Sequence, residues 1–236
     1  MKQDYTFEDI VNAVIEILNK PKVELARVGA VSVLGAANPV MGVVADVGNT
    51  FLSSYNDFKL NCLLSGLASG LKIEKRLNQL YTYVKSSPEK ALIVANTFKR
   101  TVNAESPKVC ILYGLILADH LDDSTTFTID ELIVCRALEE ATDFDLENFK
   151  IVMEEYLRPR LSEAEKVSKC QVSFPKDFDR ETELNTTCDW CVYSRLFTSH
   201  ALERQGIEDT LNLDENYYAT NAAVILLDYI HKARQI

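Results

Sequence analysis

The sequence predicts a mainly α-helical protein, in which a helical N-terminal unit packs on a helical C-terminal unit with a small β-hairpin. Apolar residues recur at i, i+3 and i+4 through most of the chain, which is the periodicity of an amphipathic helix. Ser, Thr or Asp stands before most of these segments, where a helix N-cap is needed. A chain of 236 residues can form two modest domains, and we expect units at residues 1–105 and 106–236.

The first predicted helix begins after Thr6. Asp9 stands at the third helical position, so the two side chains can cap the first turn together. An apolar stripe continues to Leu18, and Pro21 is the expected end of the helix.

The stretch from Val28 to Ala45 holds 18 residues without a charge. A membrane span needs about 20 mostly large apolar residues, whereas this stretch is rich in Gly and Ala and is interrupted by Asn38-Pro39. We interpret it as a buried helical hairpin packed through small residues. The alternative is that residues 23–52 insert into a membrane, next to the cationic side chains of Lys20, Lys22 and Arg27.

The middle of the chain predicts three helices. The first runs from Asp57 to Lys85, and Gly66 and Gly70 inside it indicate either the close approach of another helix or a kink. Ser87-Pro88 and Ser106-Pro107 are N-cap and first-turn pairs that each open a further helix. The second pair opens the sequence VCILYGLILA. Because this segment is apolar on every side, we expect it at the centre of the core.

The C-terminal half predicts helices separated by short β segments. Thr128 and Glu131 form a capping box, and Asp143 or Asp145 opens a helix that ends before Pro159. The remaining expected elements are a short helix at Ser162–Glu165, a loop with one short strand at 168–184, a helix at 185–205 ended by Gly206, a hairpin with its turn at Asp214-Glu215-Asn216, and a helix at 221–233.

The order of these last elements resembles the closing part of winged-helix domains, over about residues 128–232. In that family a helix ends in a Leu-x-x-x-Gly-Ile phrase, a β wing follows, and a final helix begins near a Thr. The matching residues are Leu202, Gly206, Ile207, Tyr218 and Thr220. The resemblance implies a helix, a two-stranded wing and a closing helix. The segment at 159–184 is longer than the family pattern.

The strongest metal-binding pattern is the pair Cys188-x-x-Cys191, because two thiolates at this spacing can bind one zinc ion. The nearest candidates for the two further ligands are Cys170 and His200. No second CxxC or paired His accompanies them, so we interpret the pair as small core residues and predict no metal site.

Two acidic motifs are also helix-terminus patterns. His120 lies among Asp119, Asp122 and Asp123, but no second His cluster supports a metal-dependent hydrolase. Residues 143–154 have the acidic spacing of a calcium loop, but the Gly that such a loop requires is absent. No catalytic constellation or cofactor motif is present, and we predict a non-enzymatic protein without a cofactor.

The net charge of −10 is unevenly distributed. Residues 1–105 carry 12 Lys and Arg against 10 Asp and Glu, whereas residues 106–236 carry 13 against 25. An acidic half repels nucleic-acid phosphates and favours basic protein partners. We therefore expect a cytoplasmic interaction or regulatory protein of the kind found in bacteria and phages, which binds a basic partner or associates with itself.

Two alternative functions stay open at this point. One is a membrane-acting effector that inserts residues 23–52. The other is a winged-helix DNA-binding regulator, which would use Arg195, His200 and Arg204 on the helix predicted at 185–205. So few positive side chains argue against nucleic-acid binding. The six cysteines and a polar, acidic N-terminal segment favour the reducing cytoplasm.

Overall fold

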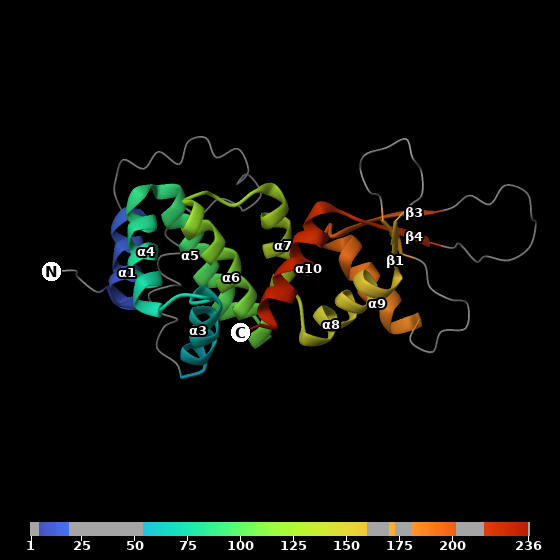
Figure 1. Cartoon of the computed structure of the whole chain (residues 1–236), viewed down its shortest axis with the longest axis horizontal. Coiled ribbons are helices and arrows are strands. Elements are labelled where there is room, and N and C mark those ends of the chain that lie inside the picture. Colours follow the sequence, from blue (N-terminus) through green and yellow to red (C-terminus); the bar gives the residue numbers. More distant parts are fainter. Residues whose placement is uncertain (1–4, 19–53, 160–169, 173–180, 202–214, 236) are drawn as a thin grey trace, which may run out of the picture. The chain divides into compact units, whose positions relative to one another are not determined.

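The computed structural model describes residues 5–18, 54–159, 170–172, 181–201 and 215–235 (Figure 1). These residues form a mainly helical protein with a small antiparallel sheet. The chain divides into two compact units, residues 1–127 (unit 1) and 128–235 (unit 2). The charge-free stretch at 28–45 and the short helix expected at Ser162 lie outside the described residues.

Unit 1 is built from helices that begin where the caps predict. Thr6 and Asp9 exchange hydrogen bonds at the start of α1, and the hydroxyls of Ser87 and Ser106 accept backbone N–H groups at the starts of α5 and α6. These three predicted helix starts are confirmed. The described helices of unit 1 are α1 (Phe7–Leu18), α3 (Ser54–Leu67), α4 (Ile73–Ser86), α5 (Pro88–Asn103) and α6 (Pro107–Asp123).

Helix α6 lies at the centre of unit 1, as its apolar sequence predicts. It packs against α3, α5 and α4 (Figure 1). Most of its residues from Val109 to Leu121 are buried, on all faces of the helix. The sequence predicts a boundary between residues 105 and 106, whereas α6 belongs to unit 1 and the two units divide after Phe127.

The single helix predicted from Asp57 to Lys85 is wrong, because the chain turns at Gly70. This residue has φ +72°, in the left-handed region that glycine adopts without steric cost. Helix α3 ends at Leu67 and α4 begins at Ile73. Gly70 therefore separates two helices that the apolar periodicity alone had joined.

Gly66 allows the close approach of a second helix. This is one of the two roles that the sequence indicated for Gly66 and Gly70. A Cβ atom at Gly66 would lie 2.1 Å from the carbonyl oxygen of Ile111 and 3.2 Å from the Cα of Gly114. A Cβ at Gly114 would lie 2.1 Å from the carbonyl oxygen of Leu63. The backbones of α3 and α6 thus touch at a pair of glycines, and neither position has room for a side chain.

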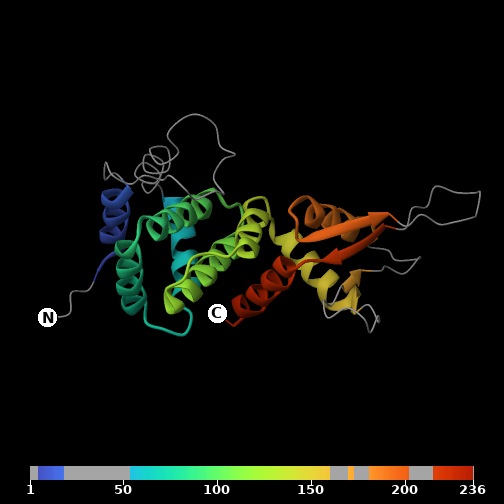
Figure 2. The same ribbon diagram turned by 90° about the horizontal axis from the view of Figure 1, so that it is seen from above.

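Unit 2 combines helices with a small antiparallel sheet. The strand order is β1-β2-β4-β3, and β3 and β4 run side by side in Figure 2. Helix α10 packs on α7 and α8, while α9 packs on α8 and β3. The described elements are α7 (Ile129–Glu139), α8 (Asp143–Ile151), a π-helical turn η1 (Val152–Tyr156), β1 (Leu157–Pro159), β2 (Cys170–Val172), α9 (Glu181–Tyr193), β3 (Phe197–Ala201), β4 (Glu215–Ala219) and α10 (Asn221–Ala233).

The helix predicted at 185–205 is wrong at its C-terminal end. Helix α9 spans Glu181–Tyr193, and Arg195 then adopts φ 67°. A left-handed residue directly after a helix is a common way to end it, but it is usually a Gly, so no local signal marked this end. Residues 197–201 continue as strand β3 instead of as helix.

The hairpin predicted with its turn at 214–216 is also misplaced. Glu215 and Asn216 lie inside β4, where they pair with Ala201 and His200 of β3. The wing therefore joins residues on either side of positions 202–214, whereas the prediction assumed a local turn. The phrase from Leu202 to Ile207 lies outside the described residues.

Further predictions in unit 2 are confirmed. Thr128 and Glu131 form both hydrogen bonds of a capping box at α7. Thr142, one residue before the predicted cap, forms a second box with Asp145 at α8. The last helix begins after Thr220 and ends at Ala233, and β2 is a short strand within the loop expected at 168–184.

The glycine pair gives a direct test of the α3–α6 contact. Ala normally stabilises a helix by about 1 kcal/mol relative to Gly. At Gly114 we expect the opposite, because the new methyl group would meet a backbone oxygen that cannot move aside. Gly114→Ala should destabilise unit 1 by about 1–3 kcal/mol, measured as a lower midpoint of chemical denaturation.

The control is Ser65→Ala, at an exposed position of α3, which should change stability by less than about 0.5 kcal/mol. An unchanged or raised midpoint in Gly114→Ala would show that the two backbones do not touch in solution.

Candidate functional site

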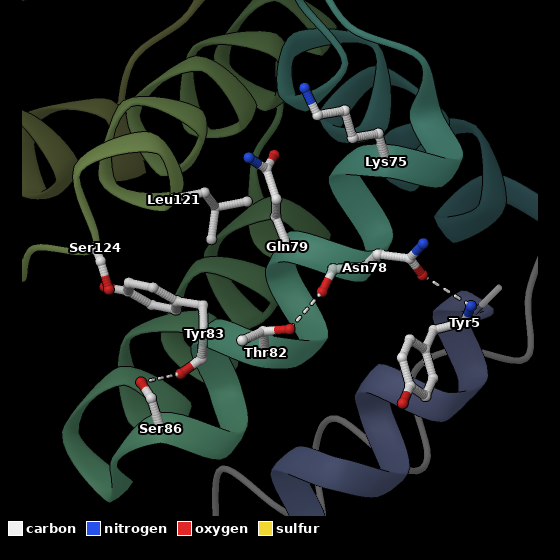
Figure 3. A pocket seen from close by; sticks show the side chains of 9 residues that line it. All are labelled: Tyr5, Lys75, Asn78, Gln79, Thr82, Tyr83, Ser86, Leu121 and Ser124. Carbon is white, nitrogen blue, oxygen red and sulfur yellow. Dashed lines mark hydrogen bonds between the residues drawn. The ribbon is translucent and has the colours of Figure 1, made fainter. Parts of the chain in front are cut away.

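The candidate site is an open pocket of about 460 Å³ on unit 1, which we call the α4 groove (Figure 3). Its base is one face of α4. Tyr5, just before α1, lies on one side, and the end of α6 lies on the other. The described lining residues are Tyr5, Lys75, Asn78, Gln79, Thr82, Tyr83, Ser86, Leu121 and Ser124.

The spacing of the α4 residues explains why they line one surface. Positions 75, 78, 79, 82, 83 and 86 follow the i, i+3, i+4 pattern of a single helix face. From position 75 to position 86 the helix rises by eleven steps, or about 16 Å at 1.5 Å per residue. The groove is therefore elongated along α4, and most of its side chains carry hydroxyl or amide groups.

Several of these polar groups are fixed by hydrogen bonds to the backbone. The hydroxyl of Thr82 donates to the carbonyl oxygen of Asn78 at 2.9 Å, and that of Ser86 donates to the carbonyl oxygen of Tyr83 at 2.7 Å (Figure 3). The side-chain oxygen of Asn78 accepts the backbone N–H of Tyr5 at 3.0 Å. The two hydroxyls keep lone pairs that can accept hydrogen bonds, and Asn78 keeps its amide NH₂ as a donor.

An apolar surface and a cation lie at the end of the groove nearest α5. Tyr83 is buried, and its hydroxyl donates to the carbonyl oxygen of Thr125 at 2.6 Å. The ammonium group of Lys90 lies 4.8 Å from the centre of the Tyr83 ring and donates to the hydroxyl of Ser124 at 2.9 Å. These contacts hold the positive charge of Lys90 beside the groove.

A salt bridge between α4 and α6 lies next to the groove and contacts its lining residue Gln79. Both terminal nitrogens of Arg76 donate to Asp122, at 2.6 and 3.0 Å, and one also donates to Gln79. Arg76 is 4% exposed, whereas the Asp122 side chain is 48% exposed. The hydrogen bonds from Arg76 lower the pKa of Asp122, and the charge of Lys75 lowers it further. This pair fixes α4 on the end of α6.

The described lining of the groove offers hydroxyls, amides and one ammonium group. It holds no carboxylate, thiol or imidazole among the described residues. Within the described lining, the groove can recognise a ligand through hydrogen bonds and charge.

The Cys188-x-x-Cys191 pair lies in the core of unit 2. Both cysteines are fully buried on α9. Burial raises the pKa of the Cys188 thiol to about 12 and also raises that of Cys191. Both are therefore neutral thiols at neutral pH.

The two further metal candidates do not lie on neighbouring strands. Cys170 is on β2 and His200 is on β3, with β4 between these two strands. The structure describes the backbone of these two residues but not their side chains. Among the described residues, no group of three or more His, Cys, Asp or Glu side chains is placed to hold a metal ion.

The acidic motifs are parts of the helix ends and of ion pairs. His120 is buried, contacts the hydroxyl of Thr125 at 2.7 Å and packs on Phe127. In the motif at 143–154, Glu147 pairs with Arg234 and Glu154 pairs with His231. These contacts give the motif residues structural roles.

Sequence reasoning missed the α4 groove. The one available signal was the polar stripe at 75, 78, 79, 82 and 86, which resembles an ordinary solvent-exposed helix face until Tyr5 and the end of α6 are placed beside it. No protein-family model matches the sequence, and no curated protein or solved structure is significantly similar to it.

The unequal burial of Arg76 and Asp122 predicts unequal effects of removing each partner. Asp122→Ala leaves a buried guanidinium with an unpaired charge, and the Nε atom of Arg76 already has no hydrogen-bond partner among the described residues. We expect Asp122→Ala to cost about 1–3 kcal/mol and Arg76→Met to cost less, because a carboxylate left half-exposed is solvated. Chemical denaturation of both variants measures the difference.

The pH dependence of the free energy of unfolding gives a second test of the Arg76–Asp122 pair. Because Arg76 holds the folded pKa of Asp122 below its ordinary value of about 3.9, the pair stabilises the fold above about pH 4 and this contribution is lost as pH falls through the folded pKa. Asp122→Asn should therefore flatten the loss of stability between about pH 5 and 2. Equal costs of the two substitutions would contradict the burial that we describe.

The burial of the cysteine pair predicts slow alkylation. In the native protein at pH 8, iodoacetamide should leave Cys188 and Cys191 unmodified, because a thiol with a pKa of about 12 holds almost no thiolate. Unfolding in denaturant should expose both to rapid modification. Mass spectrometry of the α9 peptide measures the two states, and rapid modification in the native state would show that the pair is open to solvent and to metal.

Proposed function

We propose that the chain is a non-enzymatic interaction protein that binds a basic surface of a partner protein through unit 2. The observation that carries the proposal is the exposed face of α9, formed by Glu183, Thr186, Asp189 and Tyr193 and called here the α9 face. The groove on unit 1 adds a second surface suited to binding, with hydroxyl, amide and ammonium groups in its described lining.

The division of charge between the two units supports the choice of partner. Residues 1–127 carry 13 Lys and Arg against 13 Asp and Glu, so unit 1 has no net charge. Residues 128–235 carry 12 Lys and Arg against 22 Asp and Glu. The whole net charge of −10 therefore belongs to unit 2, and such a field attracts cationic partners.

The α9 face has the composition of a protein-binding surface. Its four residues fall within one arc of the helix, and two of them are acidic. Tyr193 is 76% exposed, which is unusual for a large aromatic side chain and typical of an interface residue. The opposite face of α9 is fixed in the core by Leu184, Cys188 and Cys191, so the exposed residues are presented on a rigid support.

The DNA-binding hypothesis has less support on the same helix. In a winged-helix domain, the helix before the wing enters the major groove. Helix α9 holds this position in the chain, but it contains acidic residues at 181, 183 and 189 and no Lys or Arg. Arg195 lies after the end of the helix and His200 lies on β3, so neither of these two expected residues is on the helix. Arg204 lies outside the described residues.

The membrane hypothesis depends on residues 23–52, which lie outside the description, and it stays a prediction. Within the described segments, none of the helices combines the length and the apolar character that a membrane crossing requires.

The cytoplasm is the compartment that we propose for this interaction. The structure describes the side chains of five cysteines, and none of these five forms a disulfide bond. Cysteines persist as thiols in a reducing environment, whereas disulfides form in oxidising ones.

The α9 face predicts a local, salt-sensitive interaction with a cationic probe. The probe is a fluorescein-labelled octapeptide of alternating Lys and Ser, followed by fluorescence anisotropy. Glu183→Lys with Asp189→Lys should weaken its binding about tenfold or more at low salt, because two attractive charges become repulsive. Binding to the unmodified protein should weaken as salt rises, since exposed charges are screened over about 8 Å at physiological ionic strength.

The matched control is Glu139→Lys with Glu140→Lys at the end of α7, which changes the net charge equally at exposed positions of the same unit. Equal weakening by both pairs would show that net charge alone attracts the probe and would overturn the role of the α9 face. A mobility shift of duplex DNA above about 0.1 M salt that is lost in Arg195→Ala with Arg204→Ala would favour the DNA-binding hypothesis instead.

A further inference from the structure

We propose that the α4 groove of unit 1 binds an acidic peptide segment in an extended conformation. This site is separate from the α9 face, which the proposed function assigns to basic partners. The inference rests on three properties of the groove, its charge, its shape and its hydrogen-bonding groups, and does not depend on the proposed function of unit 2.

Two cations define the charge of the groove. Lys75 is exposed near the first turn of α4 and lines the groove, while Lys90 is held beside the other end by Ser124 and the Tyr83 ring. Asp122, whose carboxylate interacts with the charge of Lys75, is already paired through two hydrogen bonds from Arg76. The complement of this surface is an anionic ligand with charges towards both ends.

The shape of the groove favours a chain over a small molecule. Pockets for small ligands enclose most of the ligand and are lined mainly by apolar groups. The α4 groove is open along one side, and its lining combines polar side chains with apolar surface that includes Leu121 and the Tyr83 ring (Figure 3). A ligand in it therefore stays partly exposed, which favours a chain that lies along the surface over an enclosed small molecule. Its α4 face extends about 16 Å, which matches about five residues of extended peptide at about 3.3 Å per residue.

The hydrogen-bonding groups of the groove distinguish a peptide from a simple anion. Thr82 and Ser86 donate their own protons to the backbone of α4, so towards a ligand they act as acceptors. Asn78, whose oxygen is occupied by the N–H of Tyr5, offers its NH₂ group as a donor. A peptide backbone supplies both N–H and C=O groups, whereas a carboxylate ion supplies only acceptors.

The test uses the full chain and a fluorescein-labelled octapeptide of alternating Glu and Ser. Binding is followed by anisotropy at about 0.15 M salt, where exposed charges more than about 8 Å apart are largely screened. Lys75→Gln with Lys90→Gln should weaken binding at least tenfold. Replacing Glu by Gln in the peptide should weaken it similarly. Lys108→Gln, at the opposite end of α6 from the groove, removes the same kind of charge and should leave binding within about twofold of the unmodified protein.

A second variant separates occupancy of the groove from charge and from folding. Ser86→Trp keeps the charge and adds a bulky side chain at an exposed position of the groove, so it should block the peptide while the midpoint of thermal unfolding is unchanged. Binding unaffected by Ser86→Trp, or equal weakening in Lys108→Gln, would overturn the proposal. Displacement of the peptide by inorganic phosphate at equal concentration would identify a small-anion site and would also overturn it.

Discussion

The contact between Gly66 and Gly114 is the constraint on which unit 1 depends. Because neither residue has a side chain, the α3 and α6 backbones touch, and α6 can lie at the centre of the unit with most of its surface buried. The position of α6 then determines where its last turn lies. That turn supplies Asp122 to the buried Arg76 of α4 and, together with the cap that follows it, supplies Leu121 and Ser124 to the groove. A glycine pair in the core thus positions one side of the α4 groove, at the C-terminal end of the helix.

Much of the helical fold could be predicted because its signals are local. The caps at Thr6, Ser87, Ser106 and Thr128 involve residues within three positions of one another, so the sequence contains the whole interaction. One error arose where two local signals conflict, because the apolar periodicity of residues 57–85 continues through Gly70, whose positive φ separates two helices. Another arose where distant parts of the chain decide, because strand β3 forms through pairing with β4 across a long connection. Arg195 ends α9 without the Gly that usually marks such an end.

The candidate sites could be predicted from the sequence only in part. The Cys188-x-x-Cys191 pair has the most recognisable spacing in the sequence, but both side chains belong to the core of unit 2. The surfaces that we propose for binding consist of Ser, Thr, Asn, Lys and Glu on helix faces, which have no motif. These residues form a surface because of what lies beside them in the fold, such as Tyr5 next to Asn78 or the buried helix face opposite Tyr193. The sequence alone does not show which residues become neighbours in this way.

The separation of a neutral unit 1 from a unit 2 with ten excess negative charges has a kinetic consequence. A charge that is concentrated in one part of a molecule exerts a torque in the field of a charged partner, so the two molecules turn towards each other before they touch. A cationic partner approaching this protein would be steered to unit 2 in most encounters. This steering would act over a distance set by the ionic strength of the solution.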